Sequence, residues 1–186
     1  MKGKFDCVTF VNVYAPTEES DEDTVDIYDH LQEVCDRIPR YDSKIVPGDY
    51  NAKLGKEEAF RSVFGKESLH DETNNNGMRV ALFASANKLK AVSTSFPRKN
   101  IYKGTWKIPG TNEANQIDHI LTPKRWASDM ENVRTFRGAN SDTDHYVVGA
   151  TMRQKLAMAA KETSTRARKW NIEQLKDRPT NKRWWR

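Results

Sequence analysis

Hydrophobic residues near the start of the chain alternate in a way that predicts a β-strand. Between Phe5 and Tyr14 both alternating faces are apolar, with Phe10 and Tyr14 on one face and Val11 and Val13 on the other. A strand that is apolar on both faces is typical of the interior of a sheet rather than its edge. We therefore expect this segment to be buried on both sides.

The next segment has the spacing of an amphipathic helix. Apolar residues recur at helical intervals from Val25 to Ile38, and Pro39 ends the run. Ser20 followed by Asp23 resembles a capping box at the start of a helix. The pattern predicts one helix here.

A second helix is predicted further along the chain. Met78, Leu82 and Phe83 follow helical spacing, and Asn75 or Asn76 is placed to cap the N-terminus. Asparagine is a favoured N-cap because its side-chain oxygen accepts from a free backbone N–H.

The remaining pattern is mostly of short strands. They are expected over residues 44–47, 90–93, 104–106, 116–121, 133–136 and 146–152. Helices interspersed in the first half and strands dominating the second favour an α/β sandwich over a helix bundle or an all-β barrel.

Charge divides the chain into two parts. Its 186 residues carry a net charge of +5, but residues 153–186 hold eleven Lys or Arg against three acidic residues, a balance of +8 that leaves −3 for residues 1–152. We expect one domain over residues 1–152 and a basic linker or tail over residues 153–186. Two interpretations of the tail stay open, nucleic-acid binding and a solvated linker.

Other composition features exclude some classes of protein. No apolar run reaches the roughly 20 residues of a membrane-spanning helix, which predicts a soluble intracellular protein without a membrane partner. Cys7 and Cys35 lack zinc-site spacing and are expected to be buried free thiols.

Four polar clusters, each at or beside an expected strand end, could carry chemistry. They cover residues 12–17 (NVYAPT), 48–52 (GDYNA), 115–120 (NQIDHI) and 142–146 (DTDHY). Each alone also fits an ordinary turn or a surface residue, since Asp and Asn satisfy their own backbone in turns. Their joint occurrence, in one order and at strand ends, favours a functional site.

In this order and spacing the clusters resemble the endonuclease/exonuclease/phosphatase superfamily. The similarity extends over residues 5–152 and is strongest to endonucleases of RTE and BovB-type non-LTR retrotransposons, and to the craniofacial development protein 2-like proteins that descend from them. Residues 70–74, 103–106 and 134–138 look like the same family. The resemblance implies a DNase I-like fold, a two-sheet sandwich flanked by helices, and a metal-dependent endonuclease that nicks DNA.

The resemblance also implies roles for the residues of the first two clusters. Tyr14 would contact the scissile phosphate. Asp49 and Asn51 would position and activate the attacking water and polarise the phosphoryl oxygens.

The other two clusters would supply a histidine pair and a metal ligand. Asp118 would orient His145, which acts at the phosphate as base or electrostatic stabiliser, and Asp144 would help to hold the metal. Phosphodiester cleavage depends on positioning and charge neutralisation, which suits a hard cation, Mg²⁺ first and Mn²⁺ second.

Two departures from the family pattern affect these expectations. Relatives begin with a strand that ends in Asn and a second strand that carries a metal-binding Glu, and neither has a counterpart here. We therefore expect an N-terminally truncated domain with an incomplete first sheet and impaired activity. Thr143 stands where many relatives have Ser, and it retains a hydroxyl.

Nucleic-acid contacts are predicted only weakly. Trp106 could stack on a base, but core packing is the interpretation that its pattern favours. Arg166, Arg168 and Lys169 in the tail could contact DNA. In the relatives a basic segment leads toward a reverse transcriptase, which makes that domain a possible partner in a parent polyprotein.

Three functions remain open at this point. The first is a DNA-nicking endonuclease, intracellular and nuclear. The second is a non-catalytic domesticated remnant that binds nucleic acid or protein. The third is a phosphoesterase of the same fold acting on a small phosphorylated molecule or a lipid.

Overall fold

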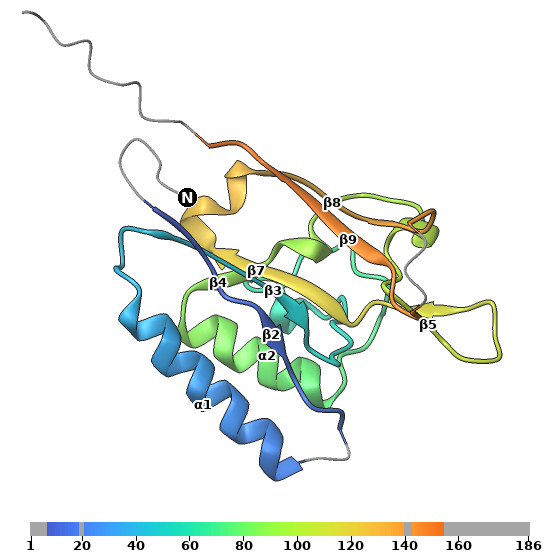
Figure 1. Ribbon diagram of the computed structural model, residues 1–186, viewed down its shortest axis with the longest axis horizontal. Coiled ribbons are helices and arrows are strands. Elements are labelled where there is room, and N and C mark those ends of the chain that lie inside the picture. The colour runs from blue at the N-terminus through green and yellow to red at the C-terminus, as the bar shows by residue number, and fades with distance from the viewer. Residues whose placement is uncertain (1–6, 19–20, 140–142, 155–186) are drawn as a thin grey trace, which may run out of the picture.

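The computed structural model describes residues 7–18, 21–139 and 143–154. Its elements form three layers, with two helices below a central sheet and a two-stranded hairpin above it (Figure 1). The helices are α1 (Asp21–Arg37) and α2 (Asn75–Ala86). The α/β fold class predicted from the sequence is confirmed.

The central sheet has five strands. They are β1 (Val8–Phe10), β2 (Val13–Tyr14), β3 (Ser43–Asp49), β4 (Leu89–Ala91) and β7 (Asp118–Pro123). Strands β1 and β2 run parallel to β3, whereas β7 runs antiparallel to both β3 and β4. This places β3 and β7 at the centre of the sheet.

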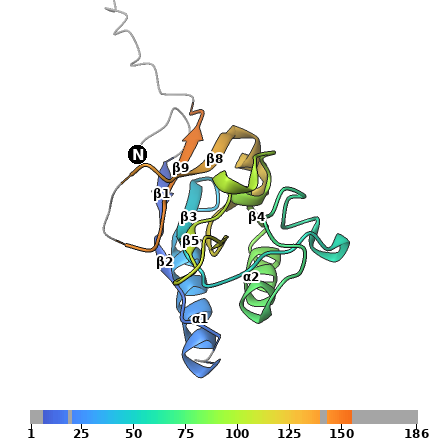
Figure 2. The same ribbon diagram turned by 90° about the vertical axis from the view of Figure 1, so that its right-hand side faces the viewer.

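Two small sheets complete the fold. They consist of β5 (Trp106–Lys107) with β6 (Ala114–Asn115), and β8 (Met130–Phe136) with β9 (Val147–Met152). Short 3₁₀ turns lie at Glu58–Phe60, Val92–Thr94, Asn100–Tyr102 and Lys124–Asp129. The hairpin β8–β9 lies on the side of the central sheet opposite the helices (Figure 2).

The two central strands are buried on both faces, and their alternation sorts the side chains. Val46 and Leu121 pack toward the helices, in a core with Leu31, Val80 and Phe83. Their neighbours Ile45 and Ile120 pack toward the hairpin, in a second core with Met130 and Val133. Because side chains alternate along a strand, Asp49 and Asp118 also face the hairpin side.

The first strand corrects a sequence prediction. It is split into β1 and β2 and lies at the edge of the sheet, not in its interior. Val8 and Val13 are buried, but Phe10 is 57% and Tyr14 is 69% exposed. Val8 is buried in the core beneath the hairpin, whereas the exposed rings of Phe10 and Tyr14 lie further along the same face, beyond that core.

The helices also differ in detail from their prediction. Asn74, and not Asn75 or Asn76, caps α2, because its side chain accepts from the backbone N–H of Gly77 at 2.9 Å. Met78 and Leu82 are 43% and 71% exposed, so the buried face of α2 is the one that carries Phe83. For α1 the expected cap at Ser20 lies outside the described residues.

The two cysteines are free thiols, as predicted, and Cys35 is buried while Cys7 is exposed. Cys7 lies beside the uncovered edge strand, which explains the error in its expected burial. The boundary expected after residue 152 stays a prediction, because residues 155–186 are outside the described part of the chain.

Candidate active site

Asp49 lies at the end of β3, where β2, β3 and β7 meet. It is the register partner of Tyr14 on β2 and of Asp118 on β7. Gly48 permits this meeting, because a Cβ there would lie 2.1 Å from the carbonyl oxygen of Val13. The glycine therefore brings β2 close enough to place Tyr14 beside Asp49.

Asn51 follows in a tight turn that faces the same point. Its φ of 47° is in the left-handed region that Asn tolerates better than most residues. Its backbone N–H donates to Asp49 Oδ1 at 2.9 Å, and its side-chain amide donates to the carbonyl of Ala15 at 2.8 Å. The Asn51 side chain thus ties the turn to the segment after β2.

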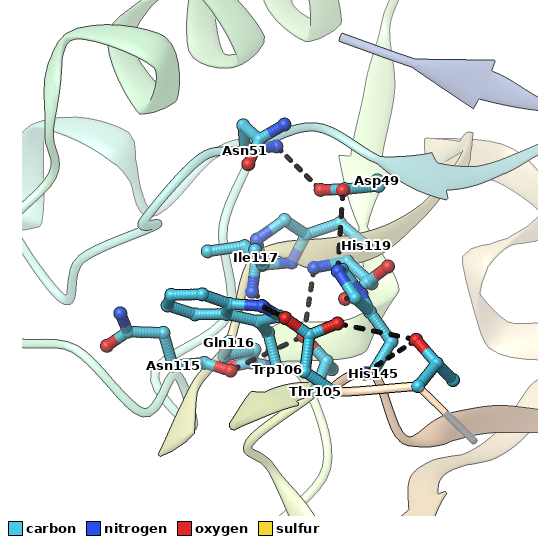
Figure 3. Close-up of polar contacts among 12 residues, drawn as sticks. Asp49, Asn51, Thr105, Trp106, Asn115, Gln116, Ile117, His119 and His145 are labelled. Atoms are coloured by element: carbon cyan, nitrogen blue, oxygen red, sulfur yellow. Dashed lines mark hydrogen bonds and ion pairs between the residues drawn. The ribbon is translucent and has the colours of Figure 1, made fainter. Parts of the chain in front are cut away.

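His145 joins two carboxylates at this end of the sheet. Its Nδ1 lies 3.2 Å from Asp118 Oδ2, and its Nε2 lies 3.9 Å from Asp49 Oδ2 (Figure 3). Because a carboxylate only accepts, the bond to Asp118 places a proton on Nδ1 and fixes the ring orientation. The sequence prediction that Asp118 lies within hydrogen-bond reach of His145 is confirmed.

Thr105 holds the strand that carries Asp118. Its hydroxyl oxygen accepts from the backbone N–H groups of Ile117 at 3.0 Å and Asp118 at 3.1 Å. The adjacent Trp106 forms an isolated bridge with His145, and the N–H of Tyr146 donates to the Thr105 carbonyl at 2.7 Å. The segment around Thr105 therefore fixes the histidine relative to its carboxylate partner.

Burial shifts the protonation of both central carboxylates. Burial raises the pKa of Asp49, partly offset by the N–H of Asn51. Burial also raises the pKa of Asp118, and the Thr105 hydroxyl partly offsets it. A bound cation would favour the ionised forms, so these carboxylates suit a site that gains positive charge on binding.

Asp144 lies at the rim and is exposed. Its Oδ2 accepts from the indole N–H of Trp106 at 2.7 Å, which lowers the pKa of its carboxyl group (Figure 3). The half-buried Trp106 donates this hydrogen bond and is not fully packed in the core, and its base stacking stays a prediction. Asp144 remains ionised and close to His145 in the chain.

A divalent cation has a compatible donor set here. Asp49, Asp118 and His145 each offer an atom within 4.8 Å of the others. Carboxylate oxygens suit hard divalent cations, and an imidazole suits softer ones, so the group fits a divalent cation without fixing which one. Asp144, the ligand expected from the sequence, is not a member of this group of three.

A surface hollow of about 290 Å³ opens beside the carboxylates. Tyr14 and Tyr146 line it together with Asp49 and Asp118. Tyr14 thus stands where the sequence analysis expected it, next to the acidic residues and open to a ligand.

A buried polar layer supports the site from the helix side of the sheet. His119 is 1% exposed; its Nε2 donates to the carbonyl of Ala52 at 2.9 Å, and its Nδ1 accepts from the Ser93 hydroxyl at 3.0 Å. Burial lowers the pKa of His119 to about 4, so the ring is neutral. It joins the strand of Asp118 to the turn of Asn51.

The structure brings together five residues predicted from the sequence. Tyr14, Asp49, Asn51, Asp118 and His145 share one end of the sheet, with Asp144 at its rim. Sequence reasoning missed two supports. Thr105 belonged to a noted cluster without an assigned role, and His119 was visible only as the residue after Asp118. The tail residues Arg166, Arg168 and Lys169 lie outside the described part of the chain.

Sequence comparison identifies curated relatives. The chain is 33% identical over 165 residues to craniofacial development protein 2 of Bos taurus, and equally so to that of Tragulus javanicus. The match covers 87% of this chain and 27% or 28% of the relatives, so the chain spans about a quarter of their length. No protein-family model matches the sequence.

Structural comparison identifies the fold. The catalytic domain of Xenopus laevis APE2 aligns over 81% of this chain and 51% of its own, with a TM-score of 0.58 and 21% identity. The Neisseria 3′ phosphatase NExo bound to a product DNA hairpin aligns over 78% and 61%, with a TM-score of 0.55 and 19% identity. The endonuclease domain of the non-LTR retrotransposon TRAS1 aligns over 78% and 57%, with a TM-score of 0.51 and 11% identity.

In the described residues, neither helix has the length and apolar character needed to cross a membrane.

Proposed function

Since the chain is a homologue of craniofacial development protein 2 with the DNase I-like fold of endonuclease/exonuclease/phosphatase proteins, we propose that it carries the site of a metal-dependent DNA endonuclease. The observation that supports this most directly is the Asp118–His145–Asp49 arrangement at the sheet end. It unites a fixed imidazole, two acids and an adjacent hollow in one place.

The residues divide the work of phosphodiester hydrolysis. Asp118 holds the proton on Nδ1 of His145, so that Nε2 faces Asp49 across 3.9 Å. Asp49 accepts the proton of the attacking water, and His145, when Nε2 also carries a proton, donates from Nε2 to a phosphoryl oxygen. Such catalysis depends on positioning and electrostatics.

Two neighbouring side chains orient the substrate in this proposal. Asn51, held at its backbone by Asp49, contributes to positioning the water. Tyr14, whose ring is open to solvent beside Asp49, contacts the scissile phosphate.

A divalent cation, Mg²⁺ or Mn²⁺, would neutralise charge on the phosphate when bound. Asp144 is the ligand that we propose for it, with the Asp49, Asp118 and His145 group as the nearest further donors. The carboxylate of Asp144 is exposed and therefore open to a cation; its Oδ2 accepts from the Trp106 N–H and its Oδ1 from the Thr143 hydroxyl at 3.3 Å, and each oxygen keeps a further lone pair.

DNA is the substrate that the comparisons favour. One structural neighbour is bound to a DNA hairpin, and another is the endonuclease domain of a retrotransposon. We further propose a retrotransposon origin, a nuclear location and, in a parent polyprotein, a reverse transcriptase as neighbour. Residues 1–152 would be the nuclease domain and residues 153–186 a basic tail.

A non-catalytic binding role is the second candidate. The three-residue donor group contains no glutamate and spans only two carboxylates. Mg²⁺ bound by few protein oxygens is weakly positioned, which would slow catalysis and leave DNA binding intact.

Nicking of supercoiled plasmid in Mg²⁺ or Mn²⁺ tests the proposal. We expect slow, metal-dependent nicking that His145→Ala reduces at least about a hundredfold, since removal of one catalytic group costs on the order of 2.7–4 kcal/mol. The control is Arg37→Ala, which removes an exposed ion pair with Glu33 in α1 and should leave the nicking rate unchanged. Nicking that survives His145→Ala would contradict the catalytic role, and binding without nicking would favour the second candidate.

A further inference from the structure

Two arginines at the site end of the β8–β9 hairpin are stacked on aromatic rings. The guanidinium of Arg134 lies 4.3 Å from the ring centroid of Phe136, and that of Arg137 lies 4.7 Å from the ring centroid of Tyr146. Among the described residues neither guanidinium has an ion pair or hydrogen-bond partner. Both positive charges are therefore held in place without being neutralised.

The other end of the hairpin shows the opposite arrangement. There the guanidinium of Arg153 forms an ion pair with the carboxylate of Glu131. One hairpin thus carries a neutralised arginine far from the site and two unneutralised arginines near it. The difference lies in the partner, a carboxylate in one case and a ring in the others.

A glycine makes room for one of the stacked pairs. A Cβ on Gly149 would lie 2.4 Å from the ring of Phe136, so the ring crosses β9 where no side chain stands. For the other pair, a Cβ on Gly104 would lie 3.4 Å from Nη2 of Arg137, so that guanidinium lies close to the backbone just before Thr105.

Each pair borders the candidate site from a different side. Arg134 lines a small cavity that also contains Asp118. The ring of Tyr146, on which Arg137 stacks, belongs to the residue that directly follows His145, and it lines the hollow that contains Asp49 and Asp118. Arg134 and the ring on which Arg137 stacks thus each line a space that also contains Asp118.

A stacked guanidinium suits a phosphodiester. Stacking engages the face of the planar group and leaves its edge N–H donors to bind two oxygens of one phosphate. A lysine has no equivalent geometry, because its ammonium group is a point charge.

We propose that Arg134 and Arg137 contact phosphates of the bound DNA strand next to the scissile phosphate. This rests on the proposed function, since it takes DNA as the ligand, but it concerns binding and not cleavage. It adds a contact surface on the hairpin beside the site, and the tail contacts expected from the sequence stay a prediction.

The test is binding of a fluorescent DNA duplex by the full chain in EDTA, where no cleavage occurs, measured by anisotropy between about 50 and 200 mM salt. Arg134→Ala and Arg137→Ala should each weaken binding roughly tenfold and reduce the salt slope by about one. Arg137→Lys should recover the slope but only part of the affinity. Arg37→Ala removes the same charge from α1 and should change neither.

Three results would overturn the inference. One is an unchanged affinity in both hairpin variants, which would make them ordinary solvated arginines. Another is an equal loss of affinity in Arg37→Ala, which would reflect net charge alone. A third is that the two arginine variants weaken binding of an RNA duplex but leave binding of the DNA duplex unchanged. Circular dichroism confirms that each variant is folded.

The binding assay separates this inference from the proposed function. If His145→Ala abolishes nicking and leaves DNA affinity intact, both hold. If the chain never nicks DNA but the two arginines still set affinity and salt slope, the inference holds and the catalytic proposal fails.

Discussion

The hairpin side of the central sheet is covered over β3, β7 and the start of β1, and it is uncovered at Phe10 and over β2. Ile45 and Ile120 are buried there beneath the hairpin, whereas Phe10 and Tyr14 are 57% and 69% exposed. The candidate site lies at the boundary between the two regions. Packing on both faces makes the covered strands rigid supports, while the uncovered strand leaves Tyr14 open to a ligand.

The covered region is further stabilised by polar contacts that cross the sheet. His119 reaches the turn of Asn51 on the helix side, while Asp118 reaches His145 on the hairpin side. Of these two adjacent residues of β7, His119 supports the fold and Asp118 belongs to the candidate site. The edge strand has no equivalent pair among the described residues, because β2 contains only Val13 and Tyr14.

The largest effect should come from His119→Ala in the covered region. It removes a fully buried ring and leaves the carbonyl of Ala52 and the hydroxyl of Ser93 without their partner. We expect a loss of about 3 kcal/mol in the free energy of unfolding, from cavity and unpaired polar groups together. Urea denaturation measures it, and a loss below about 1 kcal/mol would show that the layer is not a support.

The contrast between regions also shows what the sequence could predict. The alternation of Phe10, Val11 and Val13 predicted a strand and its two faces, but not that one face would be uncovered. Burial depends on the distant hairpin, which local pattern does not contain. The acids of the site could be predicted because each stands at a strand end, whereas Thr105 could not, since its role depends on contacts with Ile117 and Asp118 across the fold.

Acid should weaken the covered region before it affects the edge. Burial, with help from Lys53, lowers the pKa of His70 to about 4, and its Nε2 accepts from the N–H of Gln116. The unfolded histidine protonates near pH 6.5, so stability is complete above that pH and is lost as pH falls toward 4. The free energy of unfolding should fall by on the order of 2 kcal/mol between these pH values, after allowance for the partial exposure of His70.

His70→Gln keeps a neutral acceptor and should reduce this dependence, while His119, whose pKa burial also lowers to about 4, retains its own share. Thermal unfolding between about pH 7 and 4 gives the comparison. An equal slope in both proteins would assign the acid sensitivity to other groups.

A smaller effect is expected from Thr105→Val, which keeps shape and removes the hydroxyl. The N–H groups of Ile117 and Asp118 lose their acceptor, at a cost of about 1–2 kcal/mol. Amide hydrogen exchange at these two positions should accelerate while exchange in β1 stays unchanged. Unchanged protection at Ile117 and Asp118 would mean that Thr105 does not hold the strand.

The smallest effect should come from the uncovered region. Phe10→Thr keeps a strand-forming residue at an exposed position and should change stability by no more than about 0.5 kcal/mol. Val13→Thr on the buried face is the matched variant and should cost at least about 1 kcal/mol. Similar losses in both variants would remove the distinction between the two faces.

The most direct measurement of the central claim is a double-mutant cycle on metal-dependent nicking with Asp118→Asn and His145→Ala. If the two side chains act as one unit, the double variant should be no slower than His145→Ala alone. The claim of a catalytic pair would be contradicted if the double variant lost nicking rate by the product of the two single losses. It would also be contradicted if neither substitution changed the nicking rate.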